Sequence, residues 1–225
     1  IKPDRQDRYL LVGPWNHYQT YSSLNRTMDN GERKMSANAA ADLVDQRLAF
    51  YARYLKQDSS VKVQKDRVRV FVTGAPESGA DVWLDLPTFP APGTERQHIY
   101  LHSQGDARSF PGDGQLSLET PEQEPSDTYY YDPDLPTPTE AEALCDRREI
   151  EIRCDVLTYT SQPLKTPMTI LGDITLVLHA ASDCFDTDWF ARLTEVFPDG
   201  RSVAFHCSVA GMRARYRKGG KEVFL

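Results

Sequence analysis

The pattern of the sequence changes near residue 60, and this change limits the folds that the chain can adopt. Before it, apolar residues recur at helical spacing over residues 39–56, among them Val44, Leu48 and Tyr51. After Asp58-Ser59-Ser60, short apolar runs alternate with clusters of Pro, Gly and Asp. Short strands separated by turn residues are typical of an all-β sandwich or barrel. We therefore expect two parts, residues 1–62 and a β-rich part over residues 63–225.

The first part has the pattern of an α/β unit. Residues 9–12 form an apolar run that Gly13-Pro14 closes, as at the end of a buried parallel strand. A long polar loop follows and leads into the helix expected over residues 39–56, whose apolar residues lie on one face. One strand, one loop and one helix are too little to bury both faces of a sheet. We expect an apolar helix face that is exposed or used for self-association.

The second part contains eight runs that we predict as strands. Alternation is clearest in 169–180, where Ile174, Leu176 and Leu178 would share one face. Pro198-Asp199-Gly200 predicts a hairpin turn, because Pro fixes φ and Gly accepts a positive φ. The predicted strands are residues 68–73, 98–102, 128–131, 150–153, 156–159, 169–180, 189–197 and 202–212.

Charge and composition exclude several classes of function. The formal net charge is −7, whereas phosphate binding relies on clustered Lys and Arg, so we expect no nucleic-acid partner. The sequence has no apolar run of about 18 residues, and we expect no membrane partner. The four cysteines lack the C-x-x-C pairing of a zinc or redox site, and we expect free thiols in a cytoplasmic protein.

Residues 11–17 carry the one stretch with a pattern typical of catalysis. It reads Leu11-Val12-Gly13-Pro14-Trp15-Asn16-His17, a strand that runs into a turn and presents a histidine. In α/β-hydrolases the general-base histidine lies on a loop after the last strand and is followed by a helix. His17 is therefore a candidate base, and Trp15 is a candidate for lining the substrate pocket or for packing in the core. Spacing alone favours a structural histidine.

Several segments resemble the family of cocaine esterase, the Xaa-Pro dipeptidyl-peptidases and the α-amino acid ester hydrolases. Gly13-Pro14-Trp15-Asn16-His17 is similar to the family's G-P-W-x-H segment, whose last residue is the triad histidine. Further segments follow in the family's order, and 155–164 is the most specific of them. The others are residues 50–56, 68–75, 186–190, 197–201 and 211–217. The resemblance covers nearly the whole chain.

The resemblance implies a mainly β fold: a jelly-roll-like β-sandwich preceded by the last strand, His loop and helix of an α/β-hydrolase domain. It implies a serine hydrolase that cleaves ester or amide bonds, in which His17 takes the serine proton. The implied partner is a small-molecule ester, amide or peptide substrate. No metal or organic cofactor is implied.

The nucleophile of such an enzyme is missing from this sequence. No G-x-S-x-G elbow occurs in it, and in this fold the serine and aspartate precede the histidine. We therefore expect a C-terminal fragment, itself truncated within the jelly roll and inactive alone. The alternative is a non-catalytic β-sandwich interaction or carbohydrate-binding module.

Three other groups of residues suggest sites but favour structural roles. Asp186 and Asp188 form a D-x-D pair that could ligate calcium, although turn capping and pairing with Arg are commoner. Tyr129-Tyr130-Tyr131 would stack on sugars, yet alternation places Tyr130 on the face opposite the other two. The remaining histidines stand alone on predicted strands: His98, His102, His179 and His206.

Overall fold

A computed structural model of the chain describes most of the sequence. The described residues are 8–15, 31–33, 35–64, 66–74, 82–108, 112–138, 145–184, 187–205 and 210–214, the last range as backbone only. Among these residues, no helix has the length and apolar character needed to cross a membrane.

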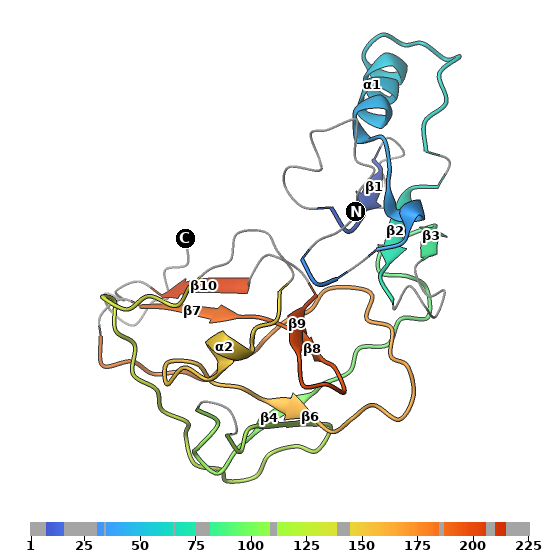
Figure 1. The fold of residues 1–225 in the computed structure, drawn as a ribbon. Coiled ribbons are helices and arrows are strands. Elements are labelled where there is room, and N and C mark those ends of the chain that lie inside the picture. The colour runs from blue at the N-terminus through green and yellow to red at the C-terminus, as the bar shows by residue number, and fades with distance from the viewer. Residues whose placement is uncertain are drawn as a thin grey trace, which may run out of the picture.

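The N-terminal part is a small sheet with one helix, and it forms its own lobe (Figure 1). Strand β1 (Leu10–Val12) pairs in parallel with β2 (Val68–Val72), which pairs antiparallel with β3 (Val82–Leu86). Between β1 and β2 lie the 3₁₀ turn η2 (Ala37–Ala39) and helix α1 (Leu43–Tyr54). The predicted strand and helix are found in the predicted order, whereas the polar loop predicted between them lies mostly outside the described residues.

Helix α1 begins at a capping aspartate and has an uncovered apolar face. The side chain of Asp42 accepts a hydrogen bond of 2.9 Å from the backbone N–H of Asp45, which satisfies one free donor of the first turn. Phe50 packs edge-on against Tyr9, with 6.3 Å between ring centroids. Leu48 is 59% exposed and Leu55 is also exposed. The exposed apolar face expected from the sequence is therefore present.

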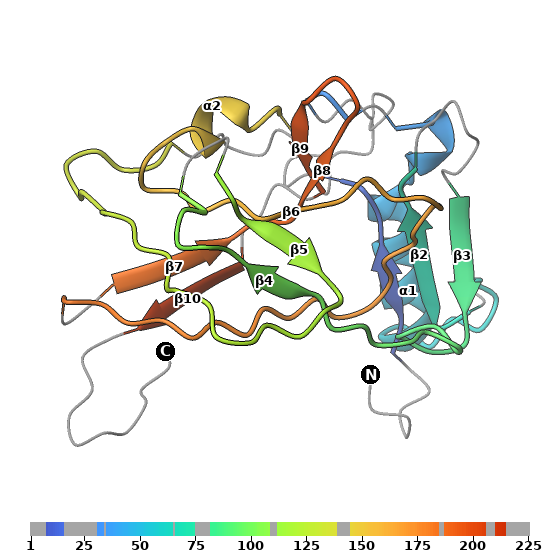
Figure 2. The ribbon, with the colours of Figure 1, turned by 90° about the horizontal axis from the view of Figure 1, so that it is seen from below.

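The rest of the chain forms a second lobe of short strands (Figure 2). One sheet has the order β4 (Tyr100–His102), β5 (Gln115–Ser117) and β6 (Thr160–Ser161). Two antiparallel pairs complete the lobe. They are β7 (Thr187–Ala191) with β10 (Ala210–Ala214), and β8 (Thr194–Val196) with β9 (Ser202–Ala204).

The hairpin predicted at Pro198-Asp199-Gly200 is confirmed, and it joins β8 to β9. Gly200 has a φ of 85°, a conformation that side chains disfavour, and its N–H donates to the carbonyl of Phe197 at 2.8 Å. The N–H of Phe197 donates to the carbonyl of Arg201 at 2.8 Å. These bonds fix the register of the hairpin through the turn.

Several strand predictions were wrong. Residues 150–153 belong to the helical turn α2 (Arg148–Glu151) and the turn after it, because Asp146 accepts the backbone N–H of Arg148 at 3.2 Å and helical bonds follow. Residues 128–131 and 169–180 form no strand, and the β pairing of 156–159 is limited to the bridge from Leu157 to Arg108. The runs 189–197 and 202–212 each break into two strands. Strands β3, β5 and β6 were missed.

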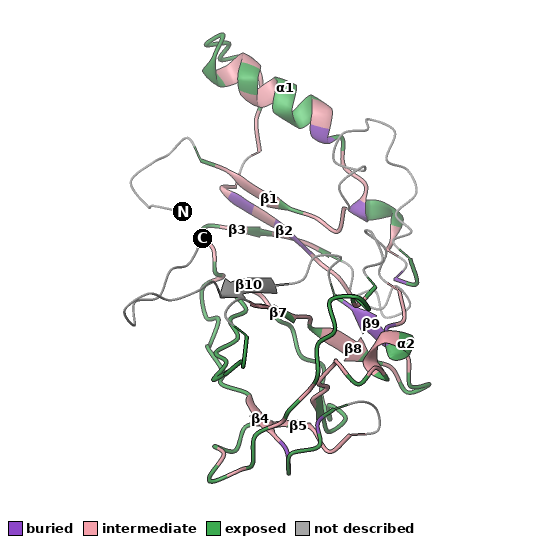
Figure 3. Ribbon diagram, turned by 90° about the vertical axis from the view of Figure 1, so that its left-hand side faces the viewer, coloured by how far each residue is buried: buried purple, intermediate pink, exposed green. Residues whose placement is uncertain are grey.

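Two small cores share one side chain (Figure 3 shows their burial). The first contains Ala39 and Phe71, and the second contains Val203 and Ala204. Met35 packs against both clusters. The segment that precedes α1 thus links the N-terminal sheet to the β8–β9 hairpin.

The mainly β fold class is confirmed, since strands outnumber helices in the described residues. These strands form four small sheets, so the jelly-roll topology stays a prediction. The boundary between residues 62 and 63 also stays a prediction. Backbone pairing crosses it, because β1 on one side pairs with β2 on the other.

Candidate functional site

The predicted base, His17, lies outside the described residues, and so does the rest of 16–30. The structure describes what flanks this segment on both sides. Strand β1, Gly13 and Trp15 precede it, and residues 31–33 follow it. The candidate site is therefore built from these flanking residues and their contacts.

Trp15 is held in the core of the N-terminal lobe. Its indole Nε1–H donates to the carbonyl of Ala39 at 2.9 Å, and its ring centroid lies 5.8 Å from that of Trp83. A methyl group on Gly13 would overlap the Trp15 ring, so a glycine is required where the indole folds back over the chain. The Gly-Pro-Trp run thus anchors the chain two residues before His17. The substrate-binding role of Trp15 stays a prediction.

Glu32 and Arg33, on the other side of the segment, contact the second lobe. Arg33 Nη2 donates to Glu195 Oε2 of β8 at 2.8 Å, and the Arg33 side chain is 8% exposed. The guanidinium carbon lies 5.0 Å from the centroid of the Phe205 ring, within range of a cation–π contact. An arginine this buried is stabilised by its partners, because an unpaired buried charge is costly.

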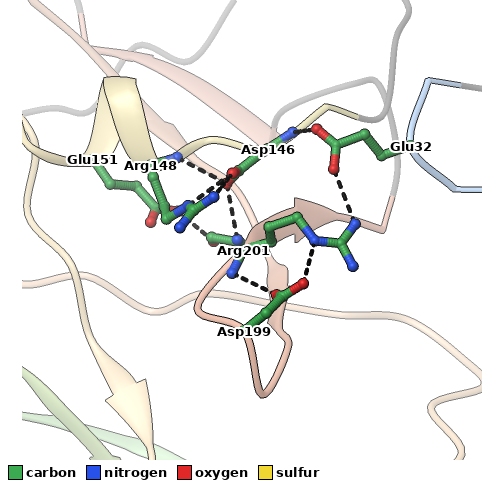
Figure 4. A network of polar contacts seen from close by, with 7 residues as sticks. Glu32, Asp146, Arg148, Glu151, Asp199 and Arg201 are labelled. Atoms are coloured by element: carbon green, nitrogen blue, oxygen red, sulfur yellow. Dashed lines mark hydrogen bonds and ion pairs between the residues drawn. The ribbon is translucent and has the colours of Figure 1, made fainter.

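Glu32 joins two further segments (Figure 4). One carboxylate oxygen accepts the backbone N–H of Asp146 at 2.9 Å, and the other accepts Nη1 of Arg201 at 3.0 Å. Arg201 Nε also donates to Asp199 Oδ2 at 2.7 Å, which lowers the pKa of Asp199. Residues far apart in the chain meet here, so spacing in the sequence gave no sign of this network.

The network continues from Asp146 to the helical turn α2 and to β9 (Figure 4). Partial burial by itself would raise the pKa of Asp146. Hydrogen bonds from Arg148 and from the Ser202 N–H have the larger effect, so the pKa is lowered. Glu151 accepts the Ser202 hydroxyl at 2.6 Å, yet burial raises the pKa of Glu151. All these groups have protein partners, so the arrangement fits an ion-pair network that fixes the fold.

His102, Ser117 and Glu124 have the residue types of a catalytic triad. His102 Nδ1 lies 2.7 Å from Glu124 Oε1, and Nε2 lies 3.0 Å from Ser117 Oγ. The same Nε2 lies 3.0 Å from the backbone carbonyl of Glu119, where it must carry a proton to form a hydrogen bond. The Glu124 carboxylate raises the pKa of His102. One ring nitrogen faces a carboxylate and the other faces a backbone carbonyl, so neither is left to accept a serine proton and this trio is a structural clamp.

Asp127 forms a second polar centre that the sequence did not indicate. It accepts the Ser103 hydroxyl and the Tyr159 hydroxyl, both at 2.6 Å, and the Ala107 N–H at 2.8 Å. Burial by itself would raise the pKa of Asp127, but the three hydrogen-bond donors together have the larger effect and lower it. Burial and this carboxylate together raise the pKa of Tyr159. Through Tyr159, these contacts tie the middle of 155–164, the most specific family segment, to the β4–β5 region.

Comparison with known proteins places the chain in a family. Residues 56–223 match the family described as the X-Pro dipeptidyl-peptidase C-terminal non-catalytic domain. The chain belongs to this family. Cocaine esterase of Rhodococcus sp. (strain MB1 Bresler) is 34% identical over 224 residues, which cover 94% of this chain. The chain spans 37% of that relative's length.

A solved structure has the same fold as the family member described here. An α-amino acid ester hydrolase superimposes with a TM-score of 0.67 at 24% sequence identity, over 93% of this chain and 36% of that one. The family resemblance predicted from the motifs is therefore confirmed. The relatives named here are hydrolases, while the X-Pro dipeptidyl-peptidase domain matched by residues 56–223 is described as non-catalytic. A structural role for His102 agrees with that description.

The other candidate residues do not assemble into a site within this X-Pro dipeptidyl-peptidase C-terminal domain. Asp186 lies outside the described residues, Asp188 lies on β7, and no metal-binding group of His, Cys, Asp and Glu occurs among the described residues. Tyr129 is half-buried, whereas Tyr130 and Tyr131 are exposed. Cys154 and Cys184 are free thiols, as predicted, Cys145 is half-buried, and Cys207 lies outside the described residues.

Proposed function

We propose that this chain is part of a serine hydrolase that cleaves ester or amide bonds, with His17 as its general base. The observation that carries the proposal is the position of the Gly-Pro-Trp-Asn-His run. It follows a strand, β1, that pairs in parallel with β2, and a helix, α1, comes after it. This is the strand, histidine loop and helix order of the α/β-hydrolases.

In the proposed mechanism, a serine supplied by a preceding part of the full-length protein attacks the substrate carbonyl. His17 accepts the serine proton as the bond to the carbonyl carbon forms, and then gives that proton to the leaving group. Residues 63–225 support the catalytic part without taking part in the chemistry. The hydrolase relatives support this assignment.

The proposal is tested by His17→Ala in the full-length protein. We expect kcat to fall by about 10⁴-fold with little change in KM, because the imidazole acts in the transition state. Trp15→Phe is the matched control, since it removes only the hydrogen bond to Ala39 and part of a ring in the core. It should change stability by about 1–2 kcal/mol and leave most of kcat. A folded His17→Ala enzyme with more than about a tenth of wild-type kcat would refute the assignment.

Residues 1–225 should be inactive by themselves. Without a serine and an oxyanion hole, a histidine offers little beyond free imidazole. The measurement is hydrolysis of an activated ester such as p-nitrophenyl acetate. Saturable hydrolysis that disappears in His17→Ala would contradict this expectation.

A further inference from the structure

Residues 172–180, which we call the open segment, have the sequence pattern of a strand but no strand partner. The even-numbered positions carry Ile174, Leu176 and Leu178, so these side chains would share one face of a strand. Within the part of the chain that the structure describes, no backbone hydrogen bond joins the open segment to another residue. A strand needs a neighbour for its N–H and C=O groups, and the open segment has room for one.

The open segment lies on the surface of the second lobe, where Figure 2 shows it as part of the orange trace along one side. Residues 173–180 are all exposed. On the even-numbered face Leu178 is 39% exposed, whereas Val177 on the odd-numbered face is 76% exposed. Ile174, also on the even-numbered face, is exposed as well. The apolar face is therefore only partly covered by its own lobe, and a second strand alongside would cover more of it.

The charges of the open segment are complementary to those of a second copy of the same segment. Asp173 stands near its start and His179 near its end. When two copies run antiparallel with Leu176 opposite Leu176, Asp173 of each copy lies opposite His179 of the other. A histidine ring N–H donates to a carboxylate, and such a cross-strand pair is favourable.

The same register also matches the apolar residues. Ile174 of one copy lies opposite Leu178 of the other, so the apolar side chains of both copies continue one face. Moving the register by two residues places Asp173 opposite Val177 or Ala181 and loses both charged pairs. Moving it by one residue places the apolar side chains of the two copies on opposite faces. The charge pattern and the apolar pattern therefore select the same register.

We propose that the open segment is a homodimer interface, in which residues 172–180 of two copies pair antiparallel about a twofold axis at Leu176. An interface of this kind is self-complementary, because each residue makes the contact that its equivalent makes in the other copy. The pairing supplies partners for the backbone groups of the open segment. It is independent of the proposed function of His17.

The register is tested by oxidising the full-length protein that carries Leu176→Cys. Residues directly opposite each other in an antiparallel pair have Cβ atoms about 4.5–5.5 Å apart, so a small shift of the strands allows a disulfide. We expect a linked dimer on a non-reducing gel. Ile174→Cys is the matched control, because its two copies would lie four residues apart along the strands, roughly 13 Å. The wild-type protein, oxidised in parallel, accounts for the native cysteines.

The charged pair is tested by sedimentation equilibrium of full-length variants. Asp173→Lys should raise the Kd of the dimer about tenfold, because the dimer contains two such pairs. Adding His179→Asp to this variant reverses the pair and should restore the Kd to within about threefold. Asp134→Lys makes the same change in net charge at an exposed position outside the open segment and should leave the Kd unchanged.

Three results would overturn the proposal. The first is a full-length protein that is monomeric at every concentration, because another part of the same chain would then cover the open segment. The second is a dimer in which Ile174→Cys cross-links as readily as Leu176→Cys, because the register would then be wrong. The third is a dimer whose Kd is unchanged by Asp173→Lys, because the contact between copies would then lie elsewhere.

Discussion

The β8–β9 hairpin and residues 162–181 were both predicted to contain strands but have different structures. Apolar residues alternate in 169–180, whereas those of the hairpin stand in the adjacent pairs Val196-Phe197 and Val203-Ala204. The hairpin pairs, buries Val203 to 1% exposure and forms an ion pair with Arg33. Residues 162–181 make no hydrogen bond with another described residue, and Val177 is 76% exposed. Alternation by itself therefore does not produce pairing, whereas a tight turn brings two strand segments together.

The largest expected difference between the two regions comes from burying a charge. Val203→Asp should destabilise the chain by about 3–5 kcal/mol, because the carboxylate would replace a buried side chain without a partner. Val177→Asp should change stability by less than about 0.5 kcal/mol, since that side chain already faces solvent. Urea unfolding followed by circular dichroism measures both. Equal losses in the two variants would show that residues 162–181 are covered in solution.

A smaller effect is expected at the turn that distinguishes the hairpin. Gly200→Ala should cost about 1–2 kcal/mol, because φ is 85° there and a Cβ is strained in that region. Gly200→Asn is the matched control and should cost less, since Asn tolerates positive φ better than Ala. The urea midpoints of the two variants give the comparison. An Ala variant as stable as wild type would mean that the turn does not hold the hairpin.

The contact between His102 of β4 and Glu124 should make the stability of the fold depend on pH. The Glu124 carboxylate raises the pKa of His102, and His102 in turn lowers the pKa of Glu124. His102 contributes fully to the free energy of unfolding below its unfolded pKa of about 6.5. This contribution is lost as pH rises through the raised pKa of the folded state. Glu124 contributes to the free energy of unfolding above its unfolded pKa of about 4.3. This contribution is lost as pH falls through the lowered pKa of the folded state.

We therefore expect the pair to stabilise the fold most between these two limits. Urea midpoints measured from pH 4 to 9 should show a loss of stability at the alkaline end that His102→Gln and Glu124→Gln both remove. Each variant deletes one partner of the same 2.7 Å contact. A slope that persists in both variants would assign the pH dependence to other groups.

Val177→Lys should have the smallest effect on stability. It should nevertheless reduce the association between chains. Unpaired extended segments with exposed apolar side chains promote association between chains, and an added lysine opposes it. The lysine should lower the mass measured by light scattering while the urea midpoint stays within the range of a surface substitution. Leu48→Lys on α1 tests the other exposed apolar face in the same assay. A wild-type chain that is strictly monomeric would contradict this expectation.

Features that depend on neighbouring residues were predicted from the sequence. Helix α1, strands β1 and β2 and the turn at Gly200 all follow from spacing, capping or turn residues within a few positions. The short strands β3, β5 and β6 were missed, because two to five residues give little periodic signal. The helical turn α2 was mistaken for a strand, since its start depends on Asp146, which also accepts the N–H of Ser202.

The sequence by itself determined the mainly β fold class, the family and the candidacy of His17, because these depend on residue types in a fixed order. Only the tertiary structure decided which residues meet across the chain. It placed Trp15 against Ala39, paired Arg33 with Glu195, and turned His102, Ser117 and Glu124 into a clamp through one backbone carbonyl. The physical reason is that an ion pair or a buried hydrogen bond depends on distance in space, and a sequence separation of 162 residues carries no information about that distance.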